Sequence, residues 1–249
     1  MRDSVGKEKW WLNSEFTRET FRDLVLYQPR TGYRFSVDAF LLADFVPLKP
    51  GARVLELGAG CGVVSLLLAR REERARFFGL EIQDRLVRCL AQNIRVNRLE
   101  ERVFAVRGDL RLPPFRPESF DVVVTNPPFY PVGRGRLSPD EEERIARHEI
   151  LATLPQVIRS AGRLLKHRGV LVIIYPATRL AELMVCLKEH RLEPKGLQMI
   201  HSYPGDEGRL VRLRASKGGG AELRIEPPFF IYQAPGGPYT PEAEALFVP

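Results

Sequence analysis

Acidic residues stand at the ends of three short apolar segments that are typical of β-strands. Glu56 lies near the end of residues 53–57, Glu81 follows residues 76–80, and Asp109 follows residues 102–106. Parallel sheets bind their ligands beyond the carboxyl ends of the strands, so these carboxylates are expected to meet at one edge. A carboxylate in the position of Glu81 can accept hydrogen bonds from both hydroxyls of a ribose. The ordered set therefore predicts a site for a nucleoside cofactor.

A glycine-rich turn follows the first of these strands, in Gly58-Ala59-Gly60-Cys61-Gly62. Glycines permit positive φ angles and let a ligand approach the backbone closely. A dinucleotide-binding turn would have Gly or Ala at the next position, where the helix packs on the strand, but Val63 stands there. The sequence thus favours a nucleoside cofactor other than a nicotinamide dinucleotide.

The pattern of Glu56 followed by Gly58, Gly60 and Gly62 resembles motif I of class I S-adenosylmethionine (SAM) methyltransferases. The resemblance implies that the glycines accommodate the amino-acid end and the sulfonium of SAM. Glu56 would then attract the positive charge of the cofactor, and Glu81 would hold its ribose. In the same resemblance, Asp109 occupies the acidic position that contacts the adenine N6.

A second motif follows the strand expected at residues 121–125, in Asn126-Pro127-Pro128-Phe129. Two prolines make this loop stiff and remove two backbone donors. The Asn126 side-chain oxygen and the Pro127 carbonyl could accept both hydrogens of an exocyclic amine, and Phe129 could stack on its base. The amine lone pair would then be aimed at a methyl carbon, so that catalysis rests on orientation and charge placement.

This loop resembles the Asn-Pro-Pro-Tyr/Phe signature of amino methyltransferases, which act on adenine N6, guanine N2 or a glutamine amide. The resemblance implies that Asn126, Pro127, Pro128 and Phe129 form the catalytic loop, with Asn126 also bordering the cofactor. Residues 28–43 resemble the segment before motif I in the bacterial tRNA adenine-N6 methyltransferases that modify valine tRNA beside the anticodon. That family implies that Arg34, Ser36 and Asp38 close the methionine end of the SAM pocket.

The expected function is therefore SAM-dependent methylation of the N6 amine of an adenine in RNA, most simply tRNA next to the anticodon. A base in a loop is partly unstacked, so its extrusion costs less than from a duplex. Three alternatives stay open: a protein glutamine N5-methyltransferase, an rRNA guanine-N2 methyltransferase, and a SAM-binding RNA scaffold without turnover. The first usually has a helical domain before motif I, the second a duplicated domain, and the third has no use for the Asn126–Phe129 loop.

The elements that must position these residues alternate between strand and helix along residues 53–190. Helices are expected after residue 62, from Asp84, over residues 151–165 and after Leu180, and Gly169 is expected to end the third. Near the C-terminus, residues 210–214 alternate as a strand does, and residues 222–226 are expected to return after a glycine turn. The pattern predicts a doubly wound, mostly parallel, seven-stranded Rossmann-like sheet with an antiparallel C-terminal hairpin. Residues 1–50 are expected to form a lead segment that packs on the cofactor site, and 51–249 the methyltransferase domain.

A formal net charge of +7 suggests a polyanionic partner, although surface arginines explain it equally well. Arg134 and Arg136 follow the catalytic loop, and Arg212 and Arg214 share one face of a strand. These four are candidate RNA contacts or else solvated residues.

The chain has no apolar run of about 18 residues and no signal-like start. Its three cysteines lack the spacing of a disulfide framework or a zinc site. We expect a cytoplasmic protein with no metal, no membrane segment and no obligate protein partner.

Overall fold

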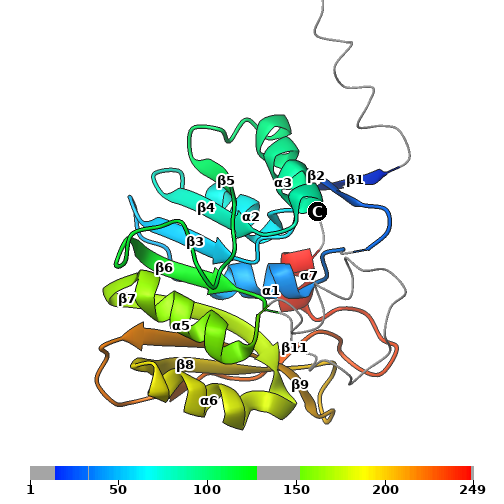
Figure 1. Ribbon diagram of the computed structural model, residues 1–249. Helices are drawn as coiled ribbons and strands as arrows, with labels where there is room; N and C mark the ends of the chain where they lie inside the picture. Colours follow the sequence, from blue (N-terminus) through cyan, green and yellow to red (C-terminus); the bar gives the residue numbers. More distant parts are fainter. Residues whose placement is uncertain (1–14, 33, 128–151, 248–249) are drawn as a thin grey trace, which may run out of the picture.

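A single mixed sheet organises the computed structural model, which describes residues 15–32, 34–127 and 152–247. Its main strands run in the order β5-β4-β3-β6-β7-β9-β8 (Figure 1). All neighbours are parallel except β9, which is antiparallel to both β7 and β8. The bounds are β3 (Arg53–Leu57), β4 (Arg76–Glu81), β5 (Val103–Arg107), β6 (Phe120–Thr125), β7 (Leu165–Pro176), β8 (Leu192–His201) and β9 (Gly208–Lys217). The expected seven-stranded, mostly parallel sheet is confirmed.

Helices cover both faces of this sheet, and the strands divide their apolar side chains between two cores. Along β7, Val172 and Ile174 belong to one core, whereas Ile173 and Tyr175 belong to the other. The first core is closed by α1 (Asp38–Phe45), α2 (Val63–Arg71), α3 (Asp84–Val96) and α7 (Pro241–Phe247), and the second by α5 (Leu154–Leu164) and α6 (Leu180–Glu189). Burial on both faces explains why these strands are nearly continuous apolar runs. Between β7 and α6 lies a single 3₁₀ turn, η1 (Ala177–Arg179).

The C-terminal hairpin exists, but its expected partner strand was wrong. β9 pairs with the preceding β8, and the residues expected to return after the glycine turn contribute only β10 (Arg224–Ile225). β10 and β11 (Phe229–Phe230) are parallel, two-residue additions to the far side of β8. The chain after β9 therefore crosses over the sheet edge instead of folding straight back.

We expected Gly169 to end a helix, but this prediction was wrong. α5 already ends at Leu164, and Gly169 lies inside β7, where the pairing with β6 shifts register between Phe120 and Val122. A Cβ at Gly169 would lie 2.9 Å from the Lys166 carbonyl oxygen and 3.1 Å from that of Asp121. The glycine is thus required by a tight bulge in the strand.

An N-terminal hairpin, β1 (Phe16–Phe21) and β2 (Leu24–Pro29), packs on α3 through two asparagines one helical turn apart. Asn93 Oδ1 accepts the Tyr27 N–H at 2.7 Å, and its Nδ2 donates to the Tyr27 carbonyl at 2.9 Å. Asn97 bonds Val25 in the same way, at 2.8 and 2.7 Å. Alternate residues of a strand and residues four apart on a helix have nearly the same spacing, about 6–7 Å. The two side-chain amides can therefore bond the backbone of β2 as a neighbouring strand would.

Across the described ranges, no helix has the length and apolar character that crossing a membrane requires.

Candidate active site

The glycine turn after β3 has the backbone conformation that its sequence predicts. Gly58, Gly60 and Gly62 have φ angles of 72°, 55° and 85°, in the region that side chains disfavour. The N–H groups of Gly58 and Ala59 both donate to the Leu80 carbonyl, at 2.9 and 3.0 Å, which ties the turn to β4. Among the described residues, apart from the two chain neighbours of Gly58, no atom lies within 4 Å of the position that a Cβ would take there. The turn therefore leaves open space above its first glycine.

Leu90 of α3 fills a notch made by two glycines from different segments. A Cβ at Gly62 would lie 2.1 Å from Leu90 Cδ1, and one at Gly79 would lie 2.7 Å from Leu90 Cδ2. This close approach fixes the start of α2, the end of β4 and the middle of α3 against one another.

Glu56 is buried, with 5% of its surface exposed, and it faces Ser65 at the start of α2. Its Oε2 accepts hydrogen bonds from the Ser65 N–H at 2.9 Å and from the Ser65 hydroxyl at 2.5 Å. Burial raises the pKa of Glu56 from 4.5 to about 8, the Ser65 bonds oppose this shift, and the Glu81 charge adds to it. A cation that bound here would favour the ionised carboxylate.

Glu81 closes the same turn from the end of β4. Its Oε2 accepts the Gly60 N–H, and its Oε1 accepts the N–H groups of Ile82 and Gln83, each at 2.9 Å. These three bonds hold the carboxylate at the end of β4, beside the glycine turn. The expected contact of Glu81 with a ribose stays a prediction.

A recess of about 40 Å³ lies between the ends of β3, β4 and β5, bordered by Gly58, Glu81, Gly108 and Asp109. Asp109 lies at its rim, where Arg111 holds its carboxylate through bonds from the backbone N–H at 2.8 Å and the guanidinium Nε at 2.8 and 3.0 Å. These side-chain bonds lower the pKa of Asp109. The three acidic residues predicted from the sequence therefore lie around one edge of the sheet.

Asn126 joins this edge from β6, which is the neighbour of β3. The Thr125 hydroxyl donates to the Leu57 carbonyl at 2.9 Å and so aligns the two strand ends. Asn126 Oδ1 is buried and has no hydrogen-bond partner among the described residues. Buried polar atoms are nearly always bonded, so an acceptor in this state indicates a place for a donor from a ligand. Pro127 follows it as a buried residue, whereas Pro128, Phe129, Arg134 and Arg136 lie outside the described residues.

The lead segment contains three candidate cofactor-binding residues, Arg34, Ser36 and Asp38. Arg34 is exposed and pairs with Glu19 of β1 at 3.0 Å. The Ser36 hydroxyl accepts the Asp38 N–H at 3.4 Å, and burial raises the pKa of Asp38. Among the described residues, no hydrogen bond or ion pair joins Arg34, Ser36 or Asp38 to the glycine turn, and their role at the cofactor stays a prediction.

Arg212 does not face solvent, which corrects its assignment as an RNA contact. It is 4% exposed, donates to the Leu41 carbonyl at 2.7 Å and pairs with Asp44 at 2.9 Å. Its guanidinium also lies over the rings of Phe45 and Phe229. Arg214 is half-buried, pairs with Glu226 and stacks on Phe45. Both arginines hold the sheet to α1 and to the C-terminal crossing.

Ser65, Asn93 and Arg111 were missed by the sequence reasoning. Ser65 interrupts an otherwise apolar stretch from Val63 to Leu68, which was a usable signal. Asn93 precedes Asn97 by one helical turn, and besides Tyr27 it bonds the Cys61 carbonyl of the glycine turn at 2.9 Å. Within the described ranges, no three His, Cys, Asp or Glu side chains form a group that could hold a metal ion.

Comparison with characterised proteins places this arrangement among methyltransferases. A protein from Flavobacterium johnsoniae named tRNA1(Val) (adenine(37)-N6)-methyltransferase is 25% identical over 89% of this chain and 94% of its own length. A protein of the same name from Porphyromonas gingivalis is 28% identical over 92% of this chain and 93% of its own length.

Solved structures confirm the fold. A predicted O-methyltransferase from Agrobacterium tumefaciens superposes with a TM-score of 0.68, at 22% identity over 84% of this chain and 94% of that chain. A geranyl diphosphate C-methyltransferase from Streptomyces coelicolor, solved with S-adenosyl-L-homocysteine, has a TM-score of 0.54 and 13% identity over 73% and 77% of the two chains. The family profile of the methyltransferase small domain matches residues 36–190. The chain belongs to the methyltransferase small domain family.

Proposed function

We propose that this chain transfers a methyl group from S-adenosylmethionine to the exocyclic N6 amine of an adenine in tRNA, beside the anticodon. The names of the two relatives that match along most of their length support the choice of substrate. The membership of the methyltransferase small domain family supports the reaction class. A tRNA substrate makes the cytoplasm the expected place of action.

The buried Oδ1 of Asn126, which has no hydrogen-bond partner in the part of the chain that the structure describes, is the observation that carries this proposal. An amide oxygen accepts hydrogen bonds, and an exocyclic amine offers two hydrogens. Asn126 directly follows β6, beside the end of β3 that begins the glycine turn. A base amine held by Asn126 is thereby brought to the same edge as Glu56.

The residues of this edge fit SAM. The buried Glu56 carboxylate suits a cationic ligand, Gly58 leaves room for it, and Glu81 and Asp109 border the recess beyond. When bound, SAM supplies a methyl group on a cationic sulfur, which becomes a neutral thioether as the adenine nitrogen takes the methyl and loses a proton to solvent.

The contribution of the chain to the reaction is orientation and charge placement. Asn126 and the Pro127 carbonyl would hold the two amine hydrogens, so that the nitrogen lone pair points toward the methyl carbon. Glu56 would balance the positive charge of the ground state, and Glu81 would fix both the turn and the ribose. No group with a strongly perturbed basicity is needed at the amine itself.

The test is methyl transfer from labelled SAM to unmodified tRNA, rRNA and a protein extract, followed by digestion and mass spectrometry. The expected product is N6-methyladenosine from tRNA. N2-methylguanosine from rRNA or methylglutamine from protein would overturn the substrate assignment. SAM binding without label in any acceptor would overturn the assignment as an enzyme and favour an RNA-binding scaffold.

A further inference from the structure

A second cavity lies at the opposite edge of the sheet, where the parallel strands begin. Its volume is about 400 Å³, and its lining includes Lys49, Lys166, His167 and Arg168 beside Asp121. Lys49 precedes β3, whereas Lys166, His167 and Arg168 form a turn within β7. We call this surface the basic edge; it consists of Lys49, Arg76, Arg116, His167, Arg168 and Arg191.

The turn that presents His167 and Arg168 is strained. Arg168 has a φ of 64°, which is unfavourable for a residue with a side chain, and Gly169 is required by the carbonyl oxygens that crowd it. The turn bulges out of β7 at the register shift with β6. Strain and bulges concentrate where a chain uses a side chain for function, so this conformation points to a role for the exposed pair.

The cations of the basic edge lack partners within the protein. Lys166 pairs with Asp121 at 2.7 Å, and Lys217 pairs with Glu118 at 3.0 Å. In contrast, the six side chains of the basic edge have no hydrogen bond or ion pair with any described residue. The positive charge that they carry is therefore available to a ligand.

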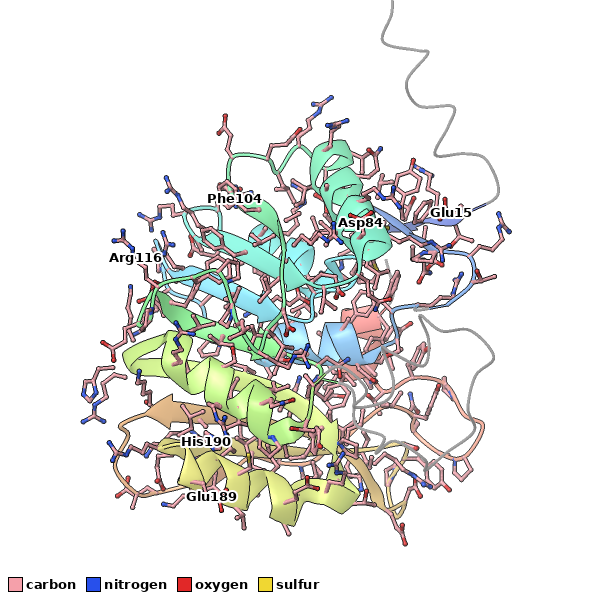
Figure 2. All side chains as sticks on the ribbon, in the orientation of Figure 1. Glu15, Asp84, Phe104, Arg116, Glu189 and His190 are labelled. Carbon is pink, nitrogen blue, oxygen red and sulfur yellow. The ribbon has the colours of Figure 1, made fainter. Side chains whose placement is uncertain are left out.

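These residues also form a connected surface. Arg76 opens β4 opposite Arg53 of β3, which donates through Nε to the Ser119 carbonyl at 3.1 Å at the start of β6. On the other side, a Cβ at Gly218 would lie 2.8 Å from His167 Cε1, and the Gly218 N–H donates to the Arg191 carbonyl at 3.2 Å. Arg116 projects at the left of Figure 2, on the side opposite Glu15. The charges thus spread over several strands, which suits a chain of phosphates better than a single anion.

We propose that the basic edge binds backbone phosphates of the RNA substrate, at a distance from the reacting base. This inference rests on the proposed function for the identity of the partner. β3, with its five residues, separates the two edges by only about 17 Å. An RNA whose loop enters the active site can therefore pass along the molecule and reach the basic edge with its stem.

The test compares two variants of equal charge. Lys49→Gln/Arg168→Gly removes two cations from the basic edge and relieves the strained φ. Arg159→Gln/Arg224→Gln removes two exposed arginines from α5 and β10 and serves as the control. Binding of full-length tRNA and of the isolated anticodon stem-loop is measured against salt concentration, together with binding of SAM.

We expect the Lys49/Arg168 variant to bind full-length tRNA about tenfold more weakly, with the slope of log K against log salt reduced by about 1.8, or 0.9 per lost phosphate contact. The control should stay within about twofold of the parent. SAM binding should be unchanged in both variants, and the isolated stem-loop, which contains the stem that reaches the basic edge, should show the same weakening as full-length tRNA. Lys49→Gln/Arg76→Gln repeats the removal of two cations without touching the strained residue.

Equal losses in the basic-edge variants and the control would overturn the inference, as would a salt slope that stays unchanged in the basic-edge variants. Failure of the proposed function would be seen in the parent protein and not in the comparison of variants. The parent itself would then bind no tRNA or transfer no label to it, whatever its variants do.

Discussion

The two edges of the sheet differ in whether their cationic side chains are paired with carboxylates. At the active-site edge, arginines are neutralised by carboxylates, as in the exposed Arg107 with Asp84 at 3.1 Å and the half-buried Arg85 with Glu15 at 2.8 Å. At the basic edge, Lys166 and Lys217 are paired in the same way, but the six side chains that define the edge have no such partner among the described residues. A surface ion pair contributes little stability, but it removes a charge that would otherwise attract phosphates.

This contrast shows what each edge is suited to do. The active-site edge acts through individually placed polar groups. Glu56 and Glu81 accept backbone N–H groups, and Asn126 Oδ1 is a buried acceptor without a partner among the described residues. The basic edge has no such arrangement of single bonds and acts through summed charge. Selection of the base and attraction of the RNA are therefore assigned to different edges, and the following predictions test that separation.

The largest effect is expected for Asn126→Ala. Removal of the acceptor should lower the rate of methyl transfer by about a hundredfold to a thousandfold, the usual cost of losing one oriented bond to the reacting group. SAM affinity, measured by calorimetry, should change by less than about twofold. Equal transfer rates in variant and parent would remove the active-site edge from base selection.

Asn93→Ala should lower the free energy of unfolding by about 3 kcal/mol, because it leaves buried groups of Tyr27 and Cys61 without partners. It should also weaken SAM binding severalfold, since the glycine turn loses a support. Asn97→Ala is the matched control, because Asn97 bonds Val25 but not the turn. Urea unfolding and calorimetry measure both effects; identical SAM affinities in the two variants would show that Asn93 serves the hairpin alone.

Glu56→Gln should weaken SAM binding about tenfold to a hundredfold at alkaline pH, by loss of a charged partner. The folded parent keeps the Glu56 proton between pH 4.5 and about 8, whereas the unfolded chain releases it. The stability of the parent should therefore fall as pH rises through this window, and its SAM affinity should rise as the carboxylate ionises. Glu56→Gln should remove both slopes, and a slope that survives in the variant would belong to another group.

The smallest effect is expected for Arg168→Gly alone. Relief of the positive φ, offset by the added freedom of the unfolded chain, should raise the free energy of unfolding by about 0.5–1 kcal/mol. Thermal unfolding at high salt, which screens the charges of the basic edge, isolates this term. A loss of stability would mean that the Arg168 side chain makes contacts that the strain argument omits.

The central elements could be predicted from the sequence because their signals are local. β3 has the bounds expected, and the apolar runs of β6 and β7 and the start of α3 near Asp84 lie close to their expected places. The active-site edge followed from them, since parallel strands bring Glu56, Glu81 and Asp109 to one side. Short, fully buried strands and a glycine turn leave few other ways to fold.

The remaining elements depend on contacts between distant segments. β8 has mixed polarity and contains Pro194 and Gly196, so neither an apolar run nor a regular alternation predicted this strand. Arg212 and Arg214 alternate as an exposed strand face does, but α1 and Phe229 cover that face and bury them. The β1–β2 hairpin is held by Asn93 and Asn97, whose partners lie more than sixty positions away.

The notch that holds Leu90 also limits how the chain can change over evolutionary time. Gly62 and Gly79 are separated in sequence, yet each would place a Cβ against a different methyl group of the same leucine. A substitution at Gly79 becomes tolerable only after Leu90 has become smaller, and a smaller residue at position 90 alone opens a cavity. Gly62 is fixed twice, by Leu90 and by its φ of 85°, so positions 79 and 90 are expected to vary together among descendants of this chain while position 62 stays glycine.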